Sequence, residues 1–237
     1  MYRYKIKIMY KYIMKMSKEF LKENISQNLI DNRDVYLDFC KLADYKIEEI
    51  LPEVQNIPGS EFLPKYYLAV CYIAFYYALT KMNETKDRAH QVIYGMIEAT
   101  LKSIPEKRRR KMCKKFMSTK KRNAYKLAVK KLEANKANSL DWKISYKDEG
   151  ENKFTIRVFE CGALTLTRTL GLGAEDIFPG FCKIDFLVAK YLGYKLDRMG
   201  TLADGYECCD FKYSIAEKEN IKAEKENIKL KEDKEKM

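Results

Sequence analysis

Cysteine and aspartate residues concentrate in one part of this chain and could carry chemistry there. Four of the seven cysteines lie between residues 161 and 209, a stretch that also contains four aspartates and is followed directly by Asp210. Cys182 and Asp185 are three residues apart on a predicted helix, so their side chains share one face. A thiol and a carboxylate placed in this way can act as nucleophile and base, or as two metal ligands. The spacing alone still favours ordinary core thiols, because cysteine is among the most buried residue types.

A predicted strand around Cys209 adds a constraint on the second group of thiols and carboxylates. Alternate residues of a strand face opposite sides, so Phe211 and Tyr213 are expected to face the core with Cys209. Cys208 and Asp210 then lie on the other side, which is either an exposed sheet face or the wall of a pocket. Cys209 and Asp210 should not point into one pocket unless a bulge intervenes.

The composition excludes several chemistries. His90 is the single histidine of the chain, which rules out histidine-rich zinc sites and mechanisms that need two histidines. We interpret it as a structural histidine on a partly apolar helix. The glycines from Gly171 to Gly173 lack the third glycine and the Lys-Ser or Lys-Thr ending of a phosphate loop. Chemistry in this chain must therefore use thiols, carboxylates and phenols.

The formal net charge of +12 comes from two segments. Residues 1–16 contribute +5 and residues 102–136 contribute +13, which leaves −6 for the rest of the chain. The second segment could bind nucleic-acid phosphates, but it carries no recognised nucleic-acid motif. Its apolar residues have helical spacing and are expected to form one buried side: Met112, Phe116, Leu127 and Leu132. We therefore predict solvated basic helices and no nucleic-acid partner, with the patch free to steer an anionic substrate.

The first half of the chain indicates helices behind a short N-terminal extension. In residues 1–16 the aromatic and aliphatic residues alternate with the bases at period two, which predicts a strand. The alternative is a translation start at Met14 or Met16, with an upstream extension that has no selected role. Residues 17–140 are predicted to be helical, with Ser60 as N-cap and Pro64 in the first turn of a central buried helix over 62–79.

The second half indicates a small sheet with helices. A hairpin is predicted from 142–146 and 154–159, helices over 161–170 and 181–191, and two further strands over 195–202 and 206–214. The expected fold class is α+β, with residues 17–140 and 141–214 in one compact domain. Residues 215–237 contain a duplicated heptad whose apolar spacing of five and two does not align a coiled-coil seam, so a solvated or disordered tail is expected.

Nothing near the N-terminus marks the chain for secretion or for a membrane. The first sixteen residues have neither a long apolar region nor a small-residue cleavage site. The longest uncharged stretch, residues 66–80, falls short of the ~18 residues of a spanning helix. We expect a cytoplasmic protein with reduced thiols and no membrane partner.

Three motifs of the second half resemble the signature of the L-2-amino-thiazoline-4-carboxylic acid hydrolase family. They are Cys-x-x-Asp at 182–185, Arg-x-x-Thr-Leu-Ala-x-Gly at 198–205 and Cys-Asp-Phe at 209–211, with Cys161 and Pro179 also in place. The resemblance extends over residues 60–213. It implies a hydrolase that opens a small cyclic amidine, a thiazoline carboxylate, to an N-carbamoyl cysteine.

The same resemblance implies roles for the matching residues. Cys182 or Cys209 would be the nucleophile, Asp185 or Asp210 the acid and base, and Arg198 the clamp for the substrate carboxylate. Thr201 and Gly205 of the central motif would complete the substrate site, and no cofactor is predicted, with a divalent metal left open. The alternative is a non-catalytic module that holds a small ligand or a metal. Its ligand set would be Cys161, Cys182, Asp185 and Cys208 or Cys209. No Cys-x-x-Cys pair supports such a metal site, so hydrolysis is preferred.

Overall fold

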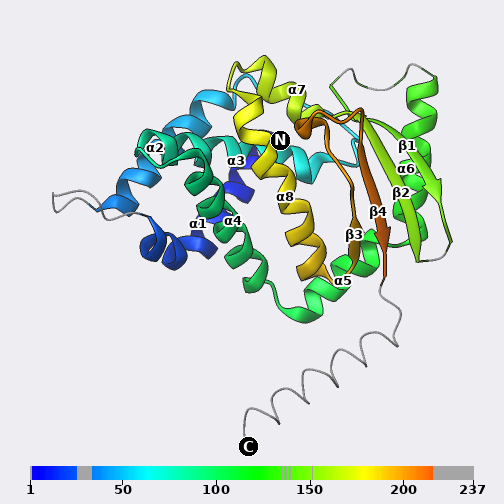
Figure 1. The fold of residues 1–237 in the computed structure, drawn as a ribbon, viewed down its shortest axis with the longest axis horizontal. Coiled ribbons are helices and arrows are strands. Elements are labelled where there is room, and N and C mark those ends of the chain that lie inside the picture. Colours follow the sequence, from blue (N-terminus) through cyan, green and yellow to red (C-terminus); the bar gives the residue numbers. More distant parts are fainter. Residues whose placement is uncertain are drawn as a thin grey trace, which may run out of the picture.

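The computed structural model describes residues 2–25, 34–134, 136, 138, 140–150 and 152–215. Six helices come first along the chain, followed by a sheet with two further helices (Figure 1). The first six helices are α1 (Tyr2–Asn24), α2 (Val35–Ile50), α3 (Leu63–Lys81), α4 (Lys86–Ser103), α5 (Glu106–Phe116) and α6 (Thr119–Glu133). This order confirms the predicted α+β class with its helical N-terminal half. Of the predicted tail, residues 215–237, all but residue 215 lie outside the described residues.

Helix α3 is the centre of the helical part. It has no charged residue from Tyr66 to Thr80, and it packs against α1, α2 and α4, so it is buried around its circumference. This confirms the predicted central helix with Pro64 in its first turn. The prediction of Ser60 as N-cap is wrong, because the cap residue is Phe62. The Ser60 hydroxyl instead accepts the backbone N–H of Phe62 at 3.1 Å and donates to Asp141 at 2.6 Å.

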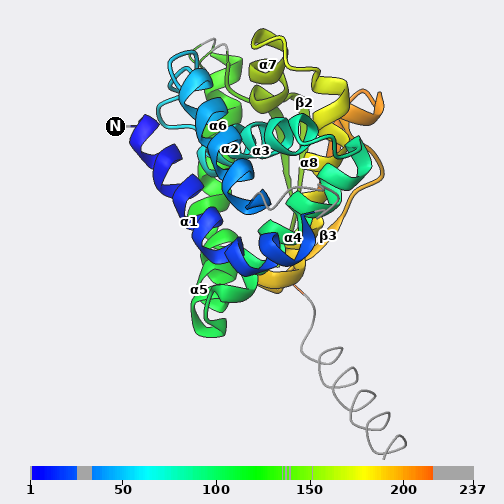
Figure 2. The ribbon, with the colours of Figure 1, turned by 90° about the vertical axis from the view of Figure 1, so that its left-hand side faces the viewer.

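The prediction of a strand in residues 1–16 is wrong, because residues 2–16 form most of helix α1. Figure 2 shows α1 along the outside of the helical part, where it packs against α4 and α3. Helix α1 also contains a stripe at helical spacing that begins in this segment, and this stripe is buried: Ile6, Tyr10, Ile13, Ser17 and Leu21. Ile6 and Tyr10 also belong to the alternating set, but three other members of that set, Tyr4, Ile8 and Tyr12, are left exposed. Burial of the helical stripe against α3 and α4 outweighs the alternating pattern, so this segment contributes to the core.

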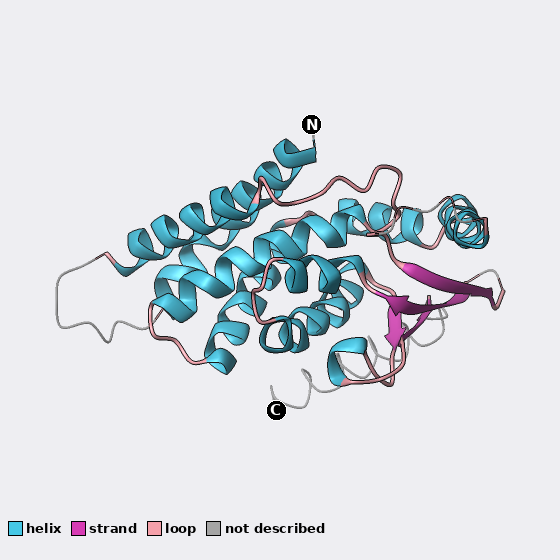
Figure 3. Ribbon diagram, turned by 90° about the horizontal axis from the view of Figure 1, so that it is seen from above, coloured by secondary structure: helices cyan, strands magenta, loops and turns pink. Residues whose placement is uncertain are grey.

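The second half forms one antiparallel sheet of four strands in the order β1-β2-β4-β3. Its elements are β1 (Lys143–Asp148), β2 (Lys153–Glu160), α7 (Gly162–Thr169), α8 (Ala174–Leu192), β3 (Lys195–Asp197), the short 3-10 helix η1 (Leu202–Asp204) and β4 (Cys209–Ser214). The β1–β2 hairpin and the α7 helix confirm the predictions. Strand β3 ends at Asp197, although the predicted strand extended to residue 202. Helix α8 begins at Ala174, whereas the predicted helix began at residue 181. Figure 3 shows the sheet at one end of the helical part.

The basic helices α5 and α6 bury a different side from the predicted one. Met112 and Leu127 are exposed, and Phe116 and Leu132 are only half-buried. The buried residues on these helices are Cys113, Arg122 and Tyr125, with α5 packed against α8 and α6 against β1. The two helices thus pack through few residues and expose most of their charge. Among the described residues, no helix combines the length and the apolar composition needed to span a bilayer.

Candidate functional site

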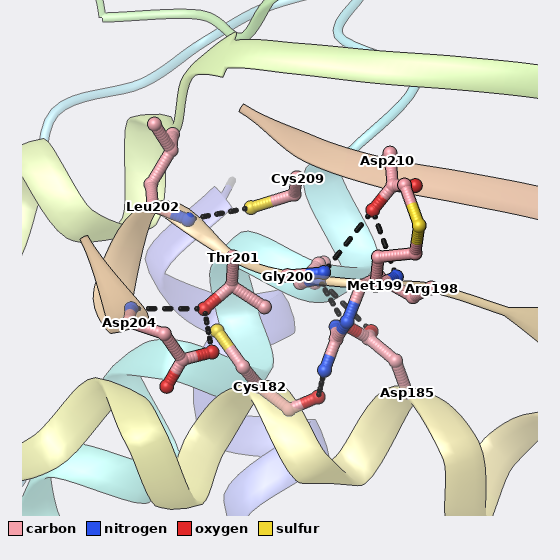
Figure 4. Close-up of polar contacts among 11 residues, drawn as sticks. Cys182, Asp185, Arg198, Met199, Gly200, Thr201, Leu202, Asp204, Cys209 and Asp210 are labelled. Carbon is pink, nitrogen blue, oxygen red and sulfur yellow. Dashed lines mark hydrogen bonds and ion pairs between the residues drawn. The ribbon is translucent and has the colours of Figure 1, made fainter. Parts of the chain in front are cut away.

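The three motifs meet where α8 passes beneath strand β4 and the segment that follows β3. Cys182 and Asp185 lie on α8, Cys209 and Asp210 at the start of β4, and Arg198 directly after β3 (Figure 4). Helix α8 contacts both β3 and η1, which fixes the distance between the motifs. The structure therefore brings together residues that are up to 28 positions apart in the chain, from 182 to 210.

Asp185 lies between two cations. Its two carboxylate oxygens accept hydrogen bonds from Lys65 Nζ at 2.9 and 2.8 Å, and Oδ2 also accepts one from Arg198 Nη1 at 2.9 Å. Arg198 Nη2 donates to the backbone carbonyl of Cys182 at 3.1 Å, so this guanidinium ties the segment after β3 to α8. Arg198 also lies over the rings of Phe186 and Phe211, at 4.8 and 5.3 Å from their centroids. Both terminal nitrogens of Arg198 are thus already engaged.

Lys65 is the site residue that sequence reasoning missed. It lies in the first turn of α3, 120 residues before Asp185, and its ammonium is 4.9 Å from the centroid of the Phe211 ring. Its side chain is 23% exposed, whereas that of Arg198 is 5% exposed. One signal was available in the sequence: Lys65 directly precedes the fifteen uncharged residues of an otherwise apolar helix. A charge at the end of a buried helix needs a partner.

Cys209 and Asp210 both bind the segment that follows Arg198, but through different atoms. The Cys209 sulfur accepts the backbone N–H of Leu202 at 3.2 Å. Asp210 Oδ1 accepts the N–H groups of Met199 and Gly200 at 2.9 and 3.2 Å. Strands β2 and β4 pair without a register shift, so no bulge turns Cys209 and Asp210 to the same side of the sheet. Both side chains are nevertheless buried. Asp210 is therefore neither on an exposed sheet face nor unpartnered, because backbone donors of this segment satisfy it.

Thr201 and Gly205 shape the loop between β3 and β4. The Thr201 hydroxyl donates to Asp204 Oδ2 at 2.6 Å and accepts the backbone N–H of Asp204 at 3.2 Å, which caps η1. Gly205 ends η1 with a φ of +83°, a left-handed conformation that favours glycine. Thr201 is 1% exposed and Gly205 lies at the surface, so their contacts are those of a tightly built turn.

The thiols near Lys65 are protonated in this environment. Burial raises the pKa of Cys182 to about 12, and Lys65 opposes this shift while Asp185 adds to it. Burial likewise raises the pKa of Cys209 to about 11, against the opposing effects of the Leu202 N–H, Lys65 and Arg198. Burial also raises the pKa of Cys161, at the start of α7, and Lys65 opposes this shift. One ammonium group therefore acts on three thiols.

The alternative metal site is not assembled. Within the part of the chain that the structure describes, no three His, Cys, Asp or Glu side chains are arranged to hold a metal ion. The set proposed from sequence, Cys161, Cys182, Asp185 and Cys208, lies inside that part. Asp185 uses both of its oxygens on Lys65, which leaves it poorly placed as a metal ligand.

His90 makes the contacts of a structural histidine. Its Nδ1 lies 2.7 Å from the Tyr72 hydroxyl, and its Nε2 lies 2.8 Å from the carbonyl oxygen of Asp176. The ring stacks on Tyr76 with centroids 5.1 Å apart. Burial is the main reason that the pKa of His90 is lowered. The histidine thus joins α3 and α4 to the beginning of α8.

Comparison with known proteins adds one finding. No curated protein and no solved structure matches the chain. One family model does match, that of L-2-amino-thiazoline-4-carboxylic acid hydrolase, and it covers residues 65–213. The match begins at Lys65 and ends in β4, so it includes all the motifs of the site and excludes α1 and α2. Because the model covers more than half of the chain, the protein belongs to the L-2-amino-thiazoline-4-carboxylic acid hydrolase family and is a hydrolase.

Proposed function

We propose that this hydrolase opens the ring of 2-amino-thiazoline-4-carboxylate, or of a closely related cyclic amidine carboxylate, to give an N-carbamoyl cysteine. The observation that carries the proposal is the meeting of the three motifs around Asp185. Thiols, a carboxylate and two cations lie together there, and this reaction needs groups of these types.

The reaction adds one water molecule to the substrate. In the first step the sulfur of Cys182 or Cys209 bonds to the amidine carbon, and the thiol proton passes to the ring nitrogen of the substrate. The bond between that carbon and the ring sulfur then breaks, and the released sulfur takes a proton from the amidinium nitrogen. Water next adds to the carbon and one of its protons passes to the imino nitrogen. The bond between the carbon and the cysteine sulfur then breaks, the second proton of the water returns to that sulfur, and the urea product leaves. A basic amidine as proton acceptor suits thiols whose pKa is raised by burial.

The two aspartates receive different roles in this proposal. Asp185 binds Lys65 and lies on the same face of α8 as Cys182, and in this proposal it would relay protons between nitrogen and sulfur. Asp210 holds two backbone N–H groups and would anchor the segment after β3 to β4. Asp185 and a carbonyl of α8 each take one N–H of a terminal nitrogen of Arg198, so the substrate carboxylate would bind the N–H groups that remain or replace Asp185 on Nη1.

The test is to incubate the purified protein with the thiazoline carboxylate and to follow the release of free thiol. Release by the wild type is expected, with a loss of at least ~10²-fold in Cys182→Ala or Cys209→Ala. Cys40→Ala is the matched control, because Cys40 is a half-buried thiol of α2 and should leave the rate unchanged. No release at any metal supplement would refute the named reaction. Release that survives both site variants would replace thiol attack with water activated by aspartate.

Metal analysis of the same sample tests the alternative function. Stoichiometric zinc or iron that is lost in Cys182→Ala, together with no thiol release, would favour a metal-binding module over a hydrolase of this substrate.

A further inference from the structure

We propose that Lys65 is the counter-ion of the Cys182 thiolate and that Asp185 acts against it. Lys65 would thus be a positioning residue that sets the reactivity of the thiol. In catalysis the inference rests on the proposed function, but the reactivity of Cys182 can be measured without any substrate.

The position of the Lys65 ammonium is fixed from several sides. Its helix, α3, is the central buried helix, and both oxygens of Asp185 hold Nζ at 2.9 and 2.8 Å. The rings of Phe181 and Phe211 lie 5.8 and 4.9 Å away from it. Phe181 is the direct neighbour of Cys182, so the ammonium lies against the turn of α8 that carries the thiol. A cation held in this way loses little entropy when a thiolate forms beside it.

The groups around this ammonium come from four elements. Helix α8 contributes Asp185 and Cys182, and the start of α7 contributes Cys161. Strand β4 contributes Cys209, and Arg198 reaches Asp185 from the segment after β3. Lys65 favours the thiolate forms of all three cysteines, whereas Asp185 opposes that of Cys182. The lysine and the aspartate therefore act on the Cys182 thiol with opposite signs.

This opposition of sign separates an electrostatic role from a structural one. If the ion pair only held the site together, the loss of either partner would disturb Cys182 in the same direction. If Lys65 is the counter-ion, Lys65→Gln lowers the thiolate fraction of Cys182 and Asp185→Asn raises it. An opposite charge within ~4–6 Å shifts a pKa by ~1–3 units, which is a factor of ~10 or more in thiolate fraction at fixed pH.

The experiment measures alkylation of Cys182 by iodoacetamide between pH 7 and 10, resolved by peptide mass spectrometry. We expect a rate about tenfold lower in Lys65→Gln and several-fold higher in Asp185→Asn, with Lys65→Arg close to the wild type. The control pair is Lys46→Gln and Glu49→Gln, because Lys46 is also buried, ion-paired at 2.6 Å and 4.8 Å from the Tyr77 centroid, but lies in α2. These controls should leave the rate at Cys182 unchanged.

Each outcome decides the matter. The inference is overturned if the alkylation rate of Cys182 changes in the same direction in both site variants, or does not change in Lys65→Gln. It is also overturned if Cys182 is not alkylated in the folded wild type at any pH. If Lys65→Gln does not fold, Asp185→Asn decides alone. Faster alkylation at unchanged stability toward urea supports an electrostatic effect on the thiol, whereas an unchanged or slower rate, or faster alkylation that comes with a loss of stability, overturns it. Opposite changes without any thiazoline hydrolysis would leave the inference standing and refute the proposed substrate. Hydrolysis of the thiazoline with unchanged alkylation in both variants would support the proposed substrate and refute the inference about Lys65.

Discussion

Gly180→Ala tests how closely α4 and α8 must approach for the site to form. A Cβ atom at residue 180 would lie 2.1 Å from His90 Nδ1, 2.5 Å from Cγ and 2.6 Å from Cε1. The imidazole cannot turn away freely, because its two nitrogens bind the Tyr72 hydroxyl and the Asp176 carbonyl and its ring stacks on Tyr76. The added methyl group must therefore push the helices apart or break the contacts of His90.

Three effects set the magnitude. Overpacking of a buried contact costs ~1–3 kcal/mol. Loss of one hydrogen bond of His90 adds ~1 kcal/mol. Alanine in place of glycine inside a helix returns ~1 kcal/mol. Because Gly180 is buried inside α8, we expect a net destabilisation of ~2 kcal/mol.

Urea denaturation of a double-mutant cycle measures this effect. His90→Ala removes the ring that the new Cβ would meet, so Gly180→Ala should cost nothing or stabilise when it is introduced into His90→Ala. Lys183→Ala, an exposed position on α8, is the control and should change stability by less than ~0.5 kcal/mol. The reasoning is refuted if Gly180→Ala is as stable as the wild type, or if its cost is the same with and without His90.

Three further predictions concern stability. Ile6→Ala should destabilise by ~2–4 kcal/mol in urea denaturation, because Ile6 is fully buried in α1; a neutral result would contradict the contribution of this helix to the core. Asp210→Ala should cost ~3 kcal/mol, because it leaves the N–H groups of Met199 and Gly200 without their carboxylate acceptor, and Asp210→Asn should cost less. Burial lowers the pKa of His90, so the unfolded chain binds more protons below pH ~6.5 and stability should fall as the pH drops through that range. His90→Gln should flatten this dependence below pH ~6.5, and a curve that is already flat in the wild type would contradict it.

The predictions from sequence succeeded where one pattern had one explanation. Residues 66–80 are uncharged, so a helix there has to be buried on every side, and α3 is. The turn-forming residues between two alternating runs predicted the hairpin of β1 and β2 correctly. Residues 1–16 carried two patterns at once, since Ile6 and Tyr10 belong both to a stripe at helical spacing and to the alternation that also includes Tyr4 and Ile8. Only packing against α3 and α4 selects the helix, and no local pattern contains that information.

For the site, the sequence by itself determined the local pairing and the family. The spacing of Cys182 and Asp185 places both on one face of a helix, and the three motifs identify the family without any structure. The tertiary structure alone decided that Lys65 joins them, that Asp185 is held between two cations, and that Asp210 anchors a loop. The physical reason is separation along the chain: Lys65 lies 120 residues from Asp185, and a charge reveals its partner only when the fold brings the two together.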